Sequence, residues 1–314
     1  MKILKRCLKA LKKPLSASKI RFSYKDQEVL RDISVNLKEK EIIAIIGKSG
    51  SGKSTFLKLI SGILSGRYKG KIKIFGKPKF LSKKRIGFIP QEMSFIPDLN
   101  LEDNIKIAGL NTGLGERKSL KQAEQLAELL KLDEPLTKKP SELSGGQKVR
   151  LNIILSLLHN PDIIILDEPF VGLDFKNRRI LWHFINTLKQ KGKSIILTSH
   201  LLTETQEYAD KFIILKNGKI LFRGKLEKLK EKLKIKYIIE IKFSKLSKQN
   251  LDKIEKYLIY NDLKILDKYN NYMMISLKEE KDRKKLERLF SKLNLDYNLL
   301  GFREPNLDEI FLRA

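Results

Sequence analysis

Between residues 20 and 223, short apolar runs alternate with longer stretches in which apolar residues recur at helical spacing. The runs at 42–46 and 163–166 are entirely apolar, which is typical of strands in a parallel sheet covered on both faces. In 119–130, apolar residues line one face of a helix. We therefore predict strands at 20–24, 33–37, 41–46, 71–75, 86–89, 163–166, 194–198, 212–215 and 219–222, and helices at 55–60, 101–108, 119–130, 144–158 and 176–190.

Asn217-Gly218 separates the last two of these strands, and this dipeptide is the strongest short signal for a β-hairpin. The alternation of strands and helices predicts an α/β domain over residues 19–224. Residues 225–236 are rich in Lys, Leu and Glu and predict a helical connector. Beyond them we predict a small α+β domain over 237–314, with strands at 237–243, within 264–277 and at 296–302, and helices at 248–260 and 281–293.

The first 21 residues contain eight Lys or Arg and no acidic residue. Leu4, Leu8, Leu11 and Leu15 recur at helical spacing, so a helix here would be amphipathic with a basic face, as in helices that lie on membranes. Pro14 interrupts this pattern. Two interpretations of a tail over residues 1–18 stay open: a solvated segment, and a contact with a membrane surface or a partner.

The whole chain has a net charge of +28, which predicts an anionic partner: nucleic acid, phospholipid or nucleotide phosphate. No apolar run approaches the roughly 18 residues that a membrane-spanning helix needs. The single cysteine, Cys7, excludes an intramolecular disulfide, and with no secretory signal we expect the reducing cytosol.

Residues 47–54 match the pattern G-x-x-x-x-G-K-[ST] of a phosphate-binding loop, with an apolar strand before them and a predicted helix after them. Glycines let the backbone N–H groups turn inward around a polyphosphate, and the helix directs its positive end at the same charge. We expect Lys53 to reach the β- and γ-phosphates and Ser54 to ligate Mg²⁺. The residues predicted to bind the nucleotide phosphates are Gly47, Lys48, Ser49, Gly50, Ser51, Gly52, Lys53, Ser54 and Thr55.

Asp167 and Glu168 directly follow the apolar strand 163–166. At the carboxyl end of a strand beside a phosphate loop, an acidic residue can hold Mg²⁺ through water, which suits Asp167. The neighbouring Glu168 can then polarise the attacking water as a general base. The sequence therefore predicts the hydrolysis of a nucleoside triphosphate.

Leu143-Ser144-Gly145-Gly146-Gln147 opens a predicted helix and is a second candidate for anion binding. Ser144 can cap the helix, and the two glycines leave backbone N–H groups bare. One nucleotide does not obviously need two such sites in one chain. Lying between the phosphate loop and the acidic strand end, these five residues resemble the signature of ATP-binding-cassette (ABC) ATPases.

The resemblance implies the fold of an ABC-type P-loop NTPase: a mixed sheet core, an antiparallel β subdomain and a helical subdomain that carries the signature. It also implies that two cassettes pack head to tail, so that the signature of one completes the ATP site of the other. Ser144, Gly146 and Gln147, with Gly145 between them, are then expected at the γ-phosphate of an ATP bound to the partner. The partner is a second copy or a paralogue.

Four further residues match motifs of the family. By resemblance, Gln91 is the glutamine that touches Mg²⁺ and water and faces the membrane partner, and His200 is the histidine that contacts the γ-phosphate. Tyr24 resembles the aromatic residue that stacks on adenine, and a core tyrosine is its alternative because Lys25 stands where the family often has Gly. Asp174 resembles the aspartate that joins the two ATP sites across the dimer.

The loop around Asp174 departs from the family pattern. Val171 and Phe175 occupy positions where Ser or Asn and Pro are common, which leaves the geometry of this loop open. The two other histidines, His159 and His183, match no motif, and we interpret both as surface residues.

Residues 304–312 resemble the end of the ATP-binding subunits of drug-efflux-type ABC exporters. The resemblance implies an ATPase that uses ATP and Mg²⁺ and works on the cytoplasmic face of the cell membrane with a separate permease chain. The alternative is a non-transport ABC ATPase that acts on ribosomes or nucleic acid. Members of the family that act on chromosomes insert long coiled coils between the phosphate loop and the signature, whereas here only about 90 residues, without heptads, separate Lys53 from Ser144. By this resemblance a nucleic-acid partner is disfavoured. The basic surface is then interpreted as facing an anionic membrane leaflet.

Overall fold

The computed structural model describes residues 13–25, 27–79, 84–306 and 309. It divides into two compact units, residues 1–223 and residues 224–314. Each predicted strand and helix between residues 20 and 302 is present, with ends that differ by a few residues. Among the described residues, none of the helices is long and apolar enough to cross a membrane.

The core of the first unit is a six-stranded sheet in the order β10-β9-β3-β8-β7-β6. Within it, each pair of neighbouring strands from β9 to β6 is parallel. Because parallel strands end at the same edge of a sheet, the loops that follow β3, β7 and β8 meet there. The strands are β3 (Ile42–Ile46), β6 (Ile86–Ile89), β7 (Ile163–Leu166), β8 (Ser194–Thr198), β9 (Lys211–Lys216) and β10 (Lys219–Gly224).

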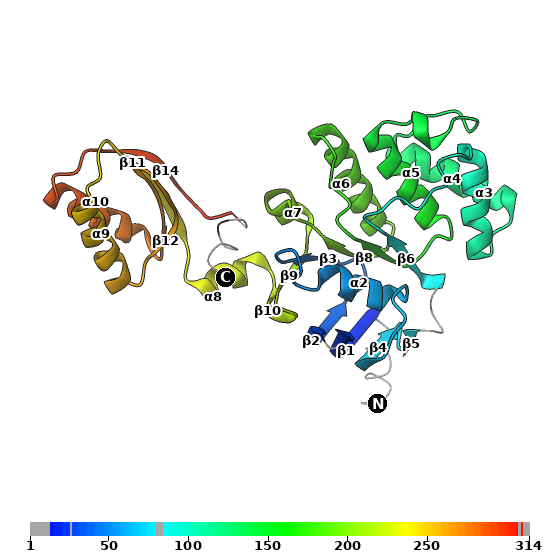
Figure 1. The fold of residues 1–314 in the computed structure, drawn as a ribbon, viewed down its shortest axis with the longest axis horizontal. Coiled ribbons are helices and arrows are strands. Elements are labelled where there is room, and N and C mark those ends of the chain that lie inside the picture. Colours follow the sequence, from blue (N-terminus) through cyan, green and yellow to red (C-terminus); the bar gives the residue numbers. More distant parts are fainter. Residues whose placement is uncertain (1–12, 26, 80–83, 307–308, 310–314) are drawn as a thin grey trace. The chain divides into compact units, whose positions relative to one another are not determined.

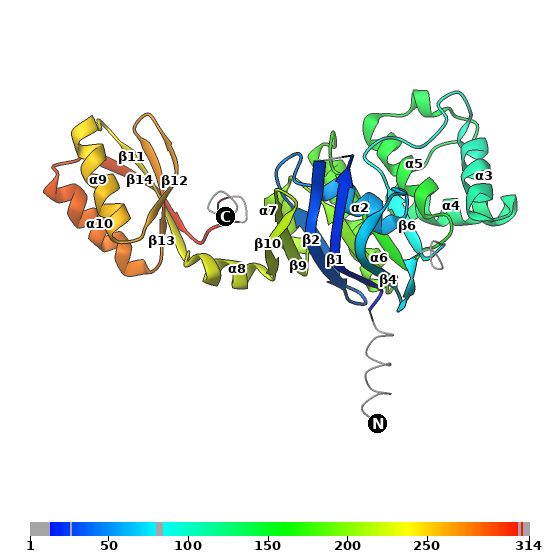
Figure 2. The same cartoon turned by 60° about the horizontal axis from the view of Figure 1, so that its bottom comes forward.

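A second sheet, in the order β2-β1-β4-β5, is antiparallel. Its buried side chains join those of β3 and helix α2 in one apolar core. Figure 2 shows β1, β2 and β4 side by side next to α2. The strands are β1 (Leu15–Tyr24), β2 (Gln27–Leu37), β4 (Tyr68–Ile74) and β5 (Lys77–Pro78).

The first strand begins earlier than the sequence predicted. We expected a tail over residues 1–18, with leucines at helical spacing as far as Leu15. In the structure, Leu15 and Ala17 are buried residues of β1, paired with β2 and β4. Leu15 and Ala17 alternate with polar residues at the two-residue period of a strand, so the interpretation of Leu15 as a helical residue is wrong. The other leucines of the pattern lie in 1–12, outside the described residues.

Helices α3, α4 and α5 form a group of their own beside the central sheet (Figure 1). Asn100 caps α3, and Ser144 and Asp174 cap α5 and α6, so the side chain of each N-cap residue accepts a backbone N–H of the first turn. The helices are α2 (Lys53–Ser61), α3 (Leu101–Thr112), α4 (Glu116–Leu130), α5 (Gly145–Leu157), α6 (Phe175–Gln190) and α7 (Leu202–Tyr208).

The hairpin between β9 and β10 has the turn that its sequence predicts. Asn217 and Gly218 both have positive φ, 48° and 73°, as the two central residues of a type I′ turn require. His159 differs from its prediction as a surface residue: it is partly buried, its Nε2 lies 3.0 Å from the carbonyl oxygen of Ile86, and burial lowers the pKa of the imidazole.

The second unit has the strand–helix–strand–strand–helix–strand order of ferredoxin-like domains. Its antiparallel sheet has the order β12-β13-β11-β14, and two helices cover one face around a common apolar core. A short helix, α8, precedes it. The elements are α8 (Leu226–Leu233), β11 (Tyr237–Phe243), α9 (Lys248–Tyr260), β12 (Lys264–Tyr269), β13 (Tyr272–Leu277), α10 (Glu280–Lys292) and β14 (Tyr297–Arg303).

Candidate functional site

The phosphate loop connects β3 to α2 and needs its glycines. Gly50 and Gly52 have positive φ, 75° and 102°, a conformation that glycine adopts without steric cost. A Cβ on Gly47 would lie 2.3 Å from the carbonyl oxygen of Leu215, so a larger residue would push the loop away from β9. The loop can therefore turn its backbone N–H groups toward one point.

Lys53 and Ser51 are buried in this loop. Lys53 Nζ donates to the carbonyl oxygen of Gly47 at 2.8 Å, which holds the ammonium group across the loop. The buried Ser51 hydroxyl has no hydrogen-bond partner among the described residues. A buried hydroxyl without a partner is costly, and an anion in the loop would supply one, so the loop fits a polyphosphate.

Ser54 and Asp167 meet at the carboxyl end of β7. Ser54 Oγ donates to Asp167 Oδ1 at 3.0 Å, and Asp167 is only 2% exposed. Mg²⁺ in nucleotide sites usually takes one or two protein oxygens and completes its shell with phosphates and water. The Ser54 hydroxyl and the Asp167 carboxylate supply protein oxygens of this kind, so the pair fits a nucleotide-bound ion.

Glu168 is held in an unusual backbone conformation next to this pair. Its φ is 51°, in the left-handed region that non-glycine residues rarely adopt. Its Oε1 lies 3.7 Å from Lys53 Nζ and 3.0 Å from His200 Nε2, with neither contact in hydrogen-bond geometry. Burial raises the pKa of the Glu168 carboxyl, and the charges of His200 and Lys53 oppose this rise. A buried carboxylate with a raised pKa is suited to accept a proton.

A cavity of about 440 Å³ brings together most of the residues predicted for nucleotide binding. Its lining includes residues 49–55 of the phosphate loop together with Glu168, His200, Gln91 and Tyr24, but not Gly47, Lys48 or Asp167. The signature residues and Asp174 do not line it. The lining residues are Tyr24, Gln27, Val29, Ser49, Gly50, Ser51, Gly52, Lys53, Ser54, Thr55, Gln91, Glu168, Val171 and His200.

Tyr24 is an exposed aromatic residue at the edge of the cavity, with 45% of its surface accessible. The Phe22 ring meets it edge to face, with the ring centroids 4.9 Å apart and the planes at 86°. Phe22 itself is buried. The Tyr24 ring is thus braced on one side and accessible on another, which fits stacking on a base and excludes the alternative of a core tyrosine.

The signature residues form the start of α5 as a capping box. Ser144 N–H donates to Gln147 Oε1 at 2.8 Å, and Gln147 N–H donates to Ser144 Oγ at 3.3 Å. Gln147 Nε2 also donates to Glu134. In this conformation the side chains of Gln147 and Ser144 are therefore both engaged within their own chain; Ser144 and Gly145 are exposed, whereas Gly146 is buried. The sequence interpretation did not identify Glu134.

Asp174 caps α6 and is connected to the signature helix. Its carboxylate accepts the backbone N–H of Asn177 at 2.7 Å and the Asn177 side-chain amide at 2.9 Å, and these bonds lower the pKa of Asp174. Arg150 Nη2, on the signature helix, donates a hydrogen bond to Asn177 Oδ1 at 2.8 Å. Asn177 also lies against Gly146, where a Cβ would come within 2.6 Å of its amide nitrogen. Sequence reasoning missed Asn177 and Arg150.

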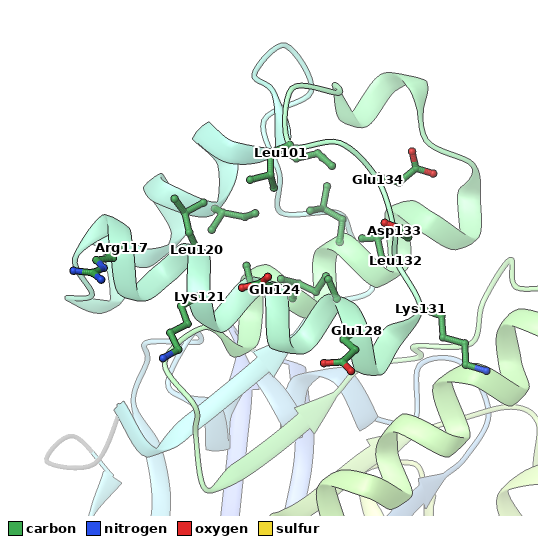
Figure 3. A pocket seen from close by; sticks show the side chains of 16 residues that line it. Leu101, Arg117, Leu120, Lys121, Glu124, Glu128, Lys131, Leu132, Asp133 and Glu134 are labelled. Atoms are coloured by element: carbon green, nitrogen blue, oxygen red, sulfur yellow. The ribbon is translucent and has the colours of Figure 1, made fainter.

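A larger cavity, of about 860 Å³, lies within the group of α3, α4 and α5 (Figure 3). Its walls are mainly apolar, with charged side chains at the rim, and it shares no residue with the nucleotide cavity. Glu134 belongs to its lining. Through the bond between Glu134 and Gln147, this cavity adjoins the signature.

Comparison with known proteins agrees with this geometry. A family model described as ABC transporter matches residues 30–171. The linearmycin resistance ATP-binding protein of Bacillus subtilis is 30% identical over 95% of this chain and 97% of its own. The Nod factor export ATP-binding protein I of Rhizobium etli is 31% identical over 70% of each chain. The dimeric structure of a bacterial ABC transporter cassette is 26% identical, with a TM-score of 0.61, over 68% of this chain and 98% of that one.

Proposed function

The chain belongs to the family of ABC transporter ATP-binding proteins and is an ATPase, and from this premise we propose that it drives export through a separate membrane permease. The predicted cassette fold is confirmed. The alternative of an ATPase acting on ribosomes or nucleic acid is not favoured, because the two relatives described above are named for linearmycin resistance and Nod factor export.

The observation that carries the catalytic part of this proposal is the buried Glu168 carboxylate at the phosphate loop. Glu168 accepts a proton from the attacking water, and Lys53 neutralises negative charge on the phosphates. His200, 3.0 Å from Glu168, lies where it can contact the terminal phosphate. When bound, Mg²⁺ neutralises charge on the phosphates, and Ser54, Asp167 and Gln91 are the residues that would hold it.

A second cassette completes the site in this proposal. Ser144 and Gly145 are exposed, and a Cβ on Gly145 would meet no other atom within 4 Å, so this helix start is accessible to a partner's nucleotide. Val171 and Phe175, on either side of Asp174 in the chain, are also exposed, by 54% and 63%. Val171 also lines the nucleotide cavity, and exposed apolar side chains support a protein partner at this face. The partner is a second copy or a paralogue.

The permease would dock beside Gln91. Met93 and Ile96, which follow Gln91 in the chain, are exposed apolar residues, by 42% and 43%. A coupling between Gln91 at the nucleotide and this apolar surface would let the state of the ATP site reach the membrane partner. We place the protein peripherally, on the cytoplasmic face of the membrane.

The direct test is to identify the membrane protein that co-purifies with the full-length chain from its own cells. Export predicts a protein with several membrane-spanning helices, retained at high salt because the docking surface is apolar. A Met93→Asp/Ile96→Asp variant should lose it, whereas Leu110→Asp, at a residue with 61% exposure on α3, should keep it. Co-purification with ribosomes alone would contradict the proposal.

A further inference from the structure

Thr198 is a buried residue whose hydroxyl contacts both acidic residues of the site, Asp167 and Glu168. It is the last residue of β8, and the residues before it in that strand, Ile195, Ile196 and Leu197, are fully buried and apolar. Thr198 is itself 0% exposed. A polar side chain in such a position must find hydrogen-bond partners, or it destabilises the fold.

Both partners of Thr198 belong to the neighbouring strand end. Thr198 Oγ1 accepts the backbone N–H of Glu168 at 2.8 Å and donates to Asp167 Oδ1 at 2.9 Å. The register of the sheet explains the contact, because Leu197 pairs with Leu166, and the next residues, Thr198 and Asp167, extend beyond that pair. One hydroxyl thus holds two consecutive residues of the site.

The bond to Glu168 coincides with the left-handed φ of this residue, 51°. Such a conformation persists only where the surroundings fix it, and it clusters at functional sites. The backbone N–H of Glu168 would be buried without a partner if the Thr198 hydroxyl were absent. Asp167 Oδ1, in turn, accepts hydrogen bonds from the hydroxyls of both Thr198 and Ser54. These two bonds fix the orientation of the Asp167 carboxylate.

We propose that Thr198 is a positioning residue for ATP hydrolysis: its hydroxyl fixes the Glu168 backbone and the Asp167 carboxylate in the arrangement that hydrolysis requires. Thr198 does not touch the reacting atoms and acts through these two residues. This inference rests on the proposed roles of Glu168 as general base and Asp167 as a magnesium-holding residue. No sequence motif pointed to it, because a threonine at the end of a strand is ordinary.

The matched variants are Thr198→Val, which keeps the shape and removes the hydroxyl, and Thr198→Ser, which keeps the hydroxyl. We expect Thr198→Val to lower kcat about 10–100-fold with KM for ATP within about threefold, because a misplaced catalytic group costs rate more than binding. Thr198→Ser should restore kcat to within about threefold of wild type. Thr187→Val is the control for a lost hydroxyl elsewhere, because the Thr187 hydroxyl donates to the carbonyl oxygen of His183 within helix α6.

A second readout does not depend on turnover. ATP binding is measured by titration calorimetry in EDTA and over a series of Mg²⁺ concentrations. Thr198→Val should bind ATP within about threefold of wild type in EDTA and at saturating Mg²⁺, but should need a higher Mg²⁺ concentration to reach half of the gain in affinity. If Thr198→Val fails to fold, Thr198→Ala is used, with hydrogen exchange across residues 163–171; there we expect faster exchange, whereas unchanged exchange would contradict the inference.

The inference is overturned if Thr198→Val keeps kcat within about threefold of wild type, or if Thr198→Ser loses as much as Thr198→Val. Glu168→Gln, assayed in parallel, distinguishes a failure of this inference from a failure of the proposed function. An inactive Glu168→Gln with a fully active Thr198→Val rejects only the role of Thr198. A fully active Glu168→Gln rejects the general base itself.

Discussion

His200 Nε2 lies 3.0 Å from Glu168 Oε1, although the two residues follow different strands, β8 and β7. Burial of Glu168 raises the pKa of its carboxyl, and a positive charge on His200 lowers it. A general base must be deprotonated to act. The protonation of Glu168 therefore decides how activity depends on pH.

We predict that kcat falls as the pH drops through the raised pKa of Glu168, at a higher pH than an ordinary glutamate, near 4.3, would give. His200→Gln removes one of the two charges that oppose the rise and leaves that of Lys53. The pKa of Glu168 should therefore rise further, and the acid limb of the residual activity should move to higher pH. The measurement is kcat at saturating ATP against pH for both proteins. An acid limb that stays in place, or moves to lower pH, would contradict this relationship.

Gly146 and Gly145 make a matched pair for the contact between the signature helix and α6. A Cβ on Gly146 would lie 2.6 Å from the Asn177 amide nitrogen, whereas a Cβ on Gly145 would meet nothing within 4 Å. Gly146→Ala should lower the free energy of unfolding by about 1–3 kcal/mol through overpacking. Gly145→Ala should leave it unchanged or raise it slightly. Denaturant unfolding measures both, and Asn177→Ala should relieve the effect of Gly146→Ala.

Glu134 should affect turnover without affecting nucleotide binding by the single chain. Its carboxylate accepts from Gln147 in the signature and from Lys138 at 2.8 Å, and it lies outside the nucleotide cavity. Glu134→Ala should reduce ATPase activity by about tenfold, on the scale of a lost hydrogen bond to a charged group, and leave the Kd for ATP of the monomer as in wild type. Glu128→Ala, on the rim of the same large cavity (Figure 3), is the control. A weakened Kd for ATP would argue against this assignment.

Tyr24 should contribute to ATP affinity through stacking. Replacing an aromatic residue that stacks on a base typically costs about 1–3 kcal/mol, so Tyr24→Ala should weaken ATP binding accordingly, whereas Tyr24→Phe should keep it. Tyr260→Ala, at a tyrosine with 89% exposure in the second unit, should change nothing. Equal losses in Tyr24→Ala and Tyr24→Phe would point to the hydroxyl rather than the ring.

The sequence predicted those parts of the site that depend on neighbouring residues in the chain. The phosphate loop is one continuous segment, and Asp167 and Glu168 directly follow an apolar strand, so their position at the edge of the sheet followed from the pattern. Thr198 and Asn177 escaped prediction because their contacts depend on strand register and on helix packing. The same limit explains Leu15: its spacing from the preceding leucines fits a helix, but pairing with β2 and β4 places it in a strand.

The central claim, that Glu168 is the general base of an ATPase that pairs with a second cassette, is tested most directly by one experiment on Glu168→Gln. ATP hydrolysis and the mass of the complex in solution are measured together, with and without ATP and Mg²⁺. We predict that the variant binds ATP, forms a dimer that wild type forms only transiently, and hydrolyses ATP about 10²–10⁴-fold more slowly. Hydrolysis at the rate of wild type would contradict the account.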